Sequence, residues 1–183
     1  MFGVSTVRTK SYGRFFMQIF LLDTKKCMNA LLLQHIFDSF MLIEGEITTF
    51  NTYHIDGRLK KEFYHQQSAT EISIPEREFS LWKEQRELCF SIIKGKLTPV
   101  GFRFVLALSA PNTAKLLEQE ELDFTMDDIQ GLYLNFKYDG LKLTCTTGTS
   151  MKLFTLDKSL ENAWDAMAGR IFAKNEIPFE NGI

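Results

Sequence analysis

LYLNFKYDGLKLTCTT, residues 132–147, is the stretch that decides the fold class. Apolar and polar residues alternate on both sides of Asp139-Gly140, and a period of two is typical of a β-strand with one buried face. An Asp-Gly pair between two such runs indicates a hairpin, because the tight turns that join antiparallel strands need positive φ angles. We therefore expect two antiparallel strands here, with one face formed by Leu132, Leu134, Phe136 and Tyr138.

Residues 159–174 carry the strongest helical pattern of the chain. Their apolar residues recur at a spacing of three and four, which places them along one side of a helix. Ser159 can cap the start of this helix, and Pro178 is expected to close the structured region. Residues 151–155 predict a further strand between the hairpin and the helix. The apolar helix positions are Leu160, Ala163, Trp164, Met167, Ala168, Ile171 and Phe172.

The segments before the hairpin continue the mixture of strands and helices. Residues 102–108 alternate as a strand, and Pro111 opens a helix of about three turns. Residues 125–128, TMDD, are typical of a helix start, so they predict a short second helix. A longer helix is expected between Pro75 and Gly95, because proline suits the first turn of a helix and glycine its end.

The N-terminal half shows a second series of elements. Residues 18–22 predict a strand, and a helix is expected from Asp23 or Thr24 to about residue 34. Residues 40–50 are rich in β-formers. Asp56-Gly57 then predicts a second hairpin with its return strand over residues 58–64. The polar residues 66–74 are expected to form a loop.

These elements predict an α+β fold in which helices pack on an antiparallel sheet. The order of strand, helix, strands around Asp-Gly, and helix occurs twice, over residues 17–94 and 101–174. This recurrence indicates two pseudo-repeated βαββ(β)α units; coincidence is the alternative, since Asp-Gly turns are common. Residues 1–16 are interpreted as a leader upstream of a natural start at Met17, or else as a genuine first strand or arm. Residues 17–183 are expected to form one globular domain.

The composition is that of a globular protein with a well-filled core. Of the 183 residues, 45% are hydrophobic and 17 are Phe. The formal net charge of −2 does not support nucleic-acid binding, because proteins that bind nucleic acids usually carry a surplus of Lys and Arg. The three cysteines are widely separated, which fits a reducing, cytoplasmic compartment. No apolar run reaches the roughly 18 residues that a membrane span needs.

Standard catalytic signatures are missing from the sequence. It contains no P-loop, no G-x-G-x-x-G, no H-E-x-x-H and no G-x-S-x-G. No cofactor and no metal are predicted. The chain is therefore interpreted as a non-enzymatic binding or interaction module, with a homodimer as one form that it could take. A small-ligand protein or metal-dependent enzyme is the alternative, and it depends on two groups of residues.

The first group is drawn from His35, Asp38, Glu44, Glu46, His54 and Asp56, and its candidate site residues are Glu44, Glu46 and His54. Residues 40–50 alternate in part, and this alternation places the carboxylates of Glu44 and Glu46 on one strand face, together with Leu42. Paired carboxylates near a histidine could hold a hard cation or perform acid–base chemistry. The simpler interpretation is the solvated face of a half-exposed sheet.

The second group is the hydroxyl-rich stretch that contains Thr146, Thr147, Thr149 and Ser150. A turn around Gly148 could offer N–H and O–H donors to a phosphate or carboxylate. The alternative is an ordinary connection between strands. Cys145 as a nucleophile is disfavoured, because all three histidines lie in the first half of the chain.

Several short segments resemble an uncharacterised family of Firmicute proteins, classed as a domain of unknown function, over about residues 17–180. The resemblance implies a bacterial cytoplasmic protein and supplies no site residues. The order of elements is also similar to that of sliding-clamp modules, which adds a nucleic-acid-associated protein as a further alternative. The segments are FDSF (37–40), EITTFNT (46–52), IDGR (55–58), CTTGTS (145–150), FTLDKSL (154–160) and EIPF (176–179).

Overall fold

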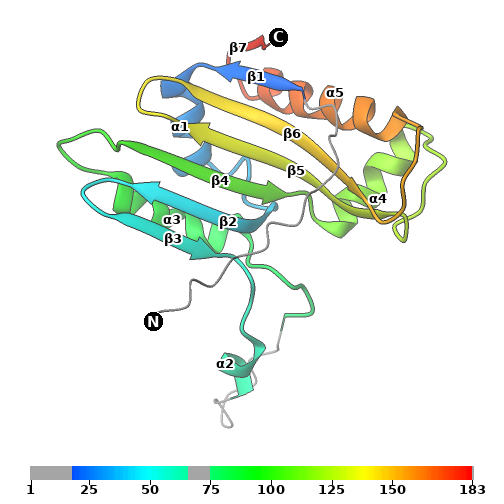
Figure 1. Ribbon diagram of the computed structural model, residues 1–183, viewed down its shortest axis with the longest axis horizontal. Coiled ribbons are helices and arrows are strands. Elements are labelled where there is room, and N and C mark those ends of the chain that lie inside the picture. Colours follow the sequence, from blue (N-terminus) through cyan, green and yellow to red (C-terminus); the bar gives the residue numbers. More distant parts are fainter. Residues whose placement is uncertain (1–17, 66–74, 183) are drawn as a thin grey trace, which may run out of the picture.

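The computed structural model describes residues 18–65 and 75–182, which form a seven-stranded antiparallel sheet with helices packed against one face (Figure 1). The strand order is β3-β2-β4-β5-β6-β1-β7. The α+β prediction is confirmed. The strands are β1 (Ile19–Leu22), β2 (Met41–Thr48), β3 (Thr52–Asp56), β4 (Gly101–Ala107), β5 (Ile129–Tyr138), β6 (Leu143–Met151) and β7 (Phe179–Asn181). The helices are α1 (Thr24–Leu32), α2 (Lys61–His65), α3 (Trp82–Ile93), α4 (Ala110–Gln119) and α5 (Ser159–Lys174).

The hairpin predicted around Asp139-Gly140 is confirmed. Tyr138 pairs with Leu143, so residues 139–142 form a four-residue connection between β5 and β6. Gly140 has a φ of +92°, which glycine adopts without steric cost. The Asp139 carboxylate accepts hydrogen bonds from the backbone N–H groups of residues 141 and 142, which fixes the turn.

The hairpin predicted around Asp56-Gly57 is wrong. The turn lies earlier, at residues 49–51, and β3 itself is the return strand that pairs with β2. Residues 58–64 do not form the expected strand; Arg58 makes an isolated bridge with Phe79, and α2 follows. Gly57 is needed for another reason. A Cβ on this residue would lie 1.7 Å from the Leu42 carbonyl oxygen, so only glycine allows the two backbones to approach so closely.

The helix expected from Pro75 begins only at Trp82. Residues 79–81 are held extended between two segments, because the Ser80 N–H donates to the Gly57 carbonyl (2.8 Å) and the Ser80 carbonyl accepts from the Leu42 N–H (2.9 Å). These backbone groups are satisfied by distant partners, which leaves none for a helical turn. The sequence correctly predicted a helix in this part of the chain, but it placed the start of that helix seven residues too early.

A β-bulge in β2 changes which residues of this strand face the helices. The register with β4 shifts between Leu42 and Glu44, so Ile43 is the extra residue of the bulge. Leu42 and Ile47 are therefore both buried under the helices. The prediction that Glu44 and Glu46 share a face is confirmed, whereas the placement of Leu42 with them is wrong.

Three smaller expectations also fail. Residues 125–128 form a turn in which the Asp128 carboxylate accepts from the Thr125 N–H and hydroxyl, rather than a short helix. Residues 152–155 do not continue as a strand. Pro178 does not end the structure, because β7 follows it and pairs with β1.

The order strand, helix, strand, strand, helix occurs in both halves, but the first strands are placed differently. β4 lies between β2 and β5, while β1 lies between β6 and β7. The duplication stays a prediction, and it loses the support of two equivalent Asp-Gly turns. The expected leader over residues 1–16 and the whole of the expected loop over residues 66–74 lie outside the described residues.

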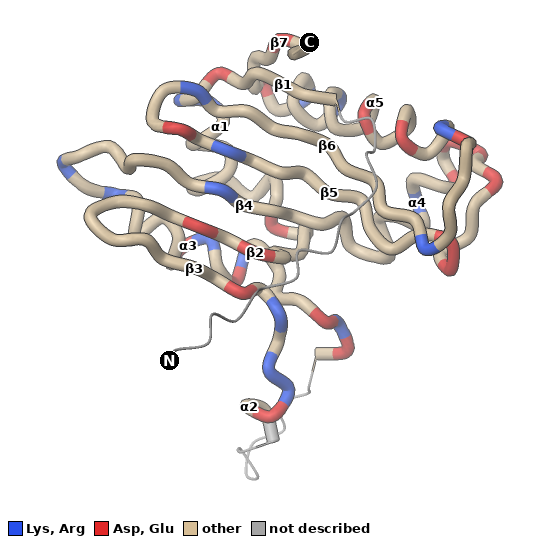
Figure 2. Tube along the Cα trace, in the orientation of Figure 1, with Lys and Arg blue, Asp and Glu red and all other residues tan. Residues whose placement is uncertain are grey.

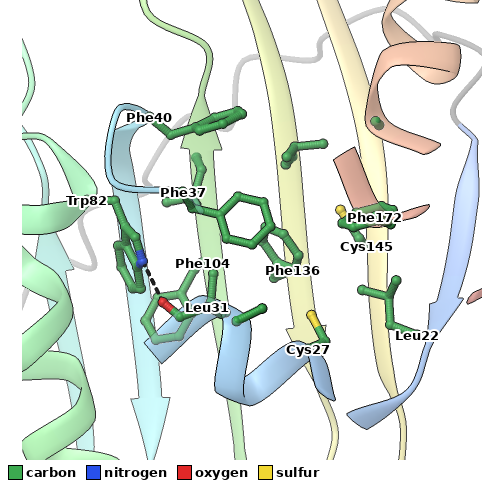
Figure 3. Packing of buried hydrophobic residues seen from close by; sticks show 14 of the residues in the cluster. Leu22, Cys27, Leu31, Phe37, Phe40, Trp82, Phe104, Phe136, Cys145 and Phe172 are labelled. Atoms are coloured by element: carbon green, nitrogen blue, oxygen red, sulfur yellow. Dashed lines mark hydrogen bonds between the residues drawn. The ribbon is translucent and has the colours of Figure 1, made fainter. Parts of the chain in front are cut away.

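The core lies between the sheet and α1, α3 and α5 (Figure 3). Trp82 packs on Phe104 with ring centroids 4.9 Å apart, and its indole N–H donates to the Leu31 carbonyl (2.8 Å). Phe136 contacts Phe37 in an edge-on arrangement. Each such side chain contributes roughly 1.5–3 kcal/mol when fully buried, so this layer dominates the stability of the fold.

Candidate functional site

Glu44, Glu46 and His54 are brought together on the open face, by which we mean the sheet face opposite the helices. The β2–β3 register places Glu46 opposite His54, and the β2–β4 register places Glu46 opposite Arg103. Together they line a shallow depression of about 350 Å³. Figure 2 shows the acidic positions of β2 beside the basic position of β4.

Every carboxylate in this depression already has a cationic or histidine partner. Arg103 Nη2 lies 2.5 Å from Glu44 Oε1, His54 Nδ1 lies 3.2 Å from Glu46 Oε2, and Lys60 Nζ lies 3.0 Å from Asp56 Oδ2. These side chains are largely exposed, so water screens the pairs. Within residues 18–65 and 75–182, no three His, Cys, Asp or Glu side chains are placed to hold a metal ion. The arrangement is that of a solvated, charge-compensated surface.

Asp56, the last residue of β3, also lines the depression, and its carboxylate is bonded to the backbone that follows. The hydrogen bond from the Arg58 backbone N–H, followed by that from Lys60, lowers the pKa of Asp56. Hydrogen bonds to the charged form favour ionisation. This carboxylate therefore holds the backbone that follows β3 and is not tuned for proton transfer near neutral pH.

The hydroxyl-rich stretch does not form the predicted turn, because β6 continues without a break through Gly148. Thr146 and Ser150 lie on the open face, whereas Thr147 and Thr149 are buried on the helix side. Gly148 pairs with Tyr133 of β5, so it is held in the extended ladder. The hydroxyls therefore point to opposite faces and do not converge on an anion.

The buried hydroxyl of Thr147 has a structural use. It donates to the Asp165 carboxylate of α5 at 2.5 Å and accepts from the Gln18 backbone N–H at 3.1 Å. Burial raises the pKa of Asp165, and the Thr147 hydrogen bond opposes that rise. These contacts connect the start of β1, the middle of β6 and α5.

The three cysteines are core residues rather than nucleophiles. Cys27, Cys89 and Cys145 are fully buried and are not disulfide-bonded. Burial raises the pKa of all three thiols, that of Cys89 to about 12. Since the thiolate is the reactive form, the expectation that Cys145 is not a nucleophile agrees with its surroundings.

Another surface, at one end of the sheet, is absent from the sequence predictions. We name it the loop-tip cluster. It contains exposed apolar side chains on three loops, of which Phe50 (87% exposed), Leu97 (86%) and Leu141 (86%) stand furthest into solvent. Sequence reasoning placed Phe50 and Leu141 inside strands and gave Leu97 no role. Its full membership is Phe50, Lys94, Lys96, Leu97, Val100, Leu141 and Lys142.

The three loops of the cluster are neighbours in space. The Val100 N–H donates to the Thr48 carbonyl (2.8 Å), which joins the α3–β4 connection to the β2–β3 turn. The Val100 carbonyl lies 3.0 Å from the position of a Cβ on Gly140, so the β5–β6 turn is in contact on the other side. Residues 94–100 include two lysines and no acidic residue. Apolar tips and lysines therefore share one end of the sheet (Figures 1 and 2).

A model of the family of unknown function DUF5721 matches residues 30–180, and the chain belongs to this family. The predicted resemblance to a domain of unknown function is thereby confirmed, while the bacterial and cytoplasmic origin stays a prediction. No curated protein and no solved structure matches the chain. In the described part of the chain, no helix has the length and apolarity to cross a membrane.

Proposed function

We propose that the protein is a non-enzymatic interaction module that docks an acidic partner surface through the loop-tip cluster. The observation that carries this proposal is the exposure of large apolar side chains on three adjacent loops beside lysines. Soluble domains expose single apolar residues routinely, but a group of them at one site is typical of an interaction surface. The lysines indicate that the partner is acidic.

The cluster has the properties that favour binding. Fully burying a large apolar side chain contributes roughly 1.5–3 kcal/mol, so three or four of them could supply the centre of an interface. The lysines add long-range attraction and speed encounter with a negatively charged surface. The loops are short and are anchored on β2, β4 and β5, which reduces the entropy lost on docking.

The charges of the open face give less support to an enzyme. The carboxylates of Glu44 and Glu46 are paired, largely exposed and without a third ligand in the described residues. The small-ligand or metal-dependent enzyme and the nucleic-acid-associated protein remain predictions from the sequence.

The test compares photo-crosslinking from the two surfaces in cells that express the protein. p-Benzoylphenylalanine replaces Phe50 or Leu141 in the cluster, and His54 or Thr146 on the open face. We expect discrete cross-linked products from the cluster positions, reduced when K96E/K142E is added. Products from position 54 or 146 with none from position 50 or 141 would move the binding surface to the open face and refute the proposal.

A further inference from the structure

The end of the sheet opposite the loop-tip cluster is also apolar, but its charge is negative. Residues 118–128 contain six acidic residues and no Lys or Arg. Residues 152–158 present Leu153 (78% exposed), Phe154 (88%) and Leu156 (84%). We name these two segments the acidic end.

The two segments of the acidic end form one surface. The Lys152 N–H donates to the Asp128 carbonyl (2.9 Å), which holds the β6–α5 connection against the α4–β5 connection. Lys152 Nζ lies 3.8 Å from Asp127 Oδ1, a weak pair that leaves the Asp127 carboxylate fully exposed. The surplus of negative charge therefore stands beside the exposed apolar side chains.

The two ends cannot meet within one molecule. β5 and β6, of 10 and 9 residues, run between them. At about 3.3 Å per residue the ends are roughly 30 Å apart. Figure 2 shows lysine positions on the α3–β4 loop and acidic residues around α4 at the other end of the sheet.

We infer that the acidic partner surface is the acidic end of a second copy of this chain, so that copies associate head to tail. This inference rests on the proposed function. Both ends expose large apolar side chains, and their charges are opposite, so each supplies what the other lacks. Two lysine-bearing ends repel each other, and so do two acidic ends. This repulsion disfavours a two-fold dimer through either surface. A contact between different surfaces forms rings where the rotation closes and open chains where it does not.

The experiment is sedimentation velocity of the purified full-length chain over a range of concentrations at low and high salt. We expect association that rises with concentration and weakens with salt, because salt screens the contact between the ends. K96E/K142E makes both ends acidic, and D123K/D127K removes the acidic surplus at the other end. Each variant alone should lower the association constant by about tenfold or more.

An equal mixture of the two variants provides the decisive measurement. In the mixture, the native lysine end of D123K/D127K meets the native acidic end of K96E/K142E. Association should return in the mixture, which a loss of folding in either variant cannot produce. The matched control, K61E/K83E, reverses two exposed lysines away from both ends and should associate like the wild type.

A wild-type chain that stays monomeric at low salt overturns the head-to-tail inference, as does a mixture without restored association. Anionic lipid vesicles then distinguish the two proposals. If the monomeric wild type binds phosphatidylserine vesicles and K96E/K142E does not, the partner of the loop-tip cluster is a lipid surface and the proposed function stands. A monomeric chain that binds no vesicles and gives no cluster cross-links refutes both.

Discussion

The two Asp-Gly pairs of the chain form similar hydrogen bonds in different surroundings. At each, the aspartate carboxylate accepts from a backbone N–H two residues later, that of Arg58 after Asp56 and that of Leu141 after Asp139. Gly140 has a positive φ at an exposed hairpin tip, whereas Gly57 has no positive φ and is buried against the backbone of β2.

The difference shows that the Asp-Gly sequence occurs in this chain for two separate structural reasons. At residue 140, glycine satisfies a local backbone conformation, which short-range sequence reasoning detects. At residue 57, glycine satisfies a close approach to Leu42, fifteen positions earlier in the chain. Only the tertiary structure contains that second requirement. Substitutions at the two pairs should therefore differ in size and in pH dependence.

The largest effect is expected for Gly57→Ala. The new Cβ would lie 1.7 Å from the Leu42 carbonyl oxygen, so β2 or the segment around residue 57 must move. We expect a loss of about 3 kcal/mol or more in the free energy of unfolding, the upper part of the range for overpacked sites. Urea unfolding followed by the fluorescence of the buried Trp82 and Trp164 measures it.

Gly95→Ala is the matched control for that substitution. A Cβ at residue 95 meets no atom closer than 3.8 Å, so the change in stability should stay within about 0.5 kcal/mol. Equal losses at residues 57 and 95 would contradict the close-approach explanation.

Gly140→Ala should have an intermediate effect. Its φ of +92° is unfavourable for a residue with a Cβ, and the Cβ would lie 3.0 Å from the Val100 carbonyl oxygen. We expect a loss of about 1–2 kcal/mol. Gly140→Asn should lose less, because asparagine tolerates positive φ better. The same urea experiment ranks the two; alanine as good as asparagine here would argue against backbone strain.

The aspartates should make stability depend on pH in the acidic range. The backbone N–H of Lys142, followed by that of Leu141, lowers the pKa of Asp139 below its usual value. The unfolded chain therefore binds this proton more readily, so the contribution is present above about pH 4 and is lost as pH falls through the folded pKa. Asp139→Asn should lower Tm at neutral pH, and the difference from wild type should vanish in strong acid. A Tm difference that stays constant with pH would exclude this linkage.

The smallest effect is expected on the open face beside the first Asp-Gly pair. Glu46→Gln and His54→Gln remove an exposed cross-strand pair at 3.2 Å. Their coupling in a double-mutant cycle should be no more than about 0.5 kcal/mol. A coupling several times larger would indicate that this pair is part of a functional site.

Local signals predicted much of the fold. The β5–β6 hairpin and α5 depend on patterns within one short segment, and both appear where they were expected. The bulge at Ile43 and the extended residues 79–81 were missed, because backbone contacts between distant segments fix them. Alternation alone also could not show that β2 turns at residues 49–51.

The candidate site was predicted in part. The shared face of Glu44 and Glu46 follows from strand alternation, but Arg103, which neutralises Glu44, comes from a strand 59 positions away. The exposure of Phe50 depends on the position of the turn, which the misplaced hairpin concealed. Asn51, a residue type that favours turns, was the one local signal for a turn there.

The burial of Cys27, Cys89 and Cys145 has a practical consequence for chemical labelling. Maleimide and iodoacetamide dyes react with exposed thiolates, so the native fold is inert to them without any cysteine replacement. One cysteine introduced at residue 97 or 154 would then carry a single fluorophore at either end of the sheet. The native thiols react only when the fold opens, so their slow modification reports the rate of opening residue by residue.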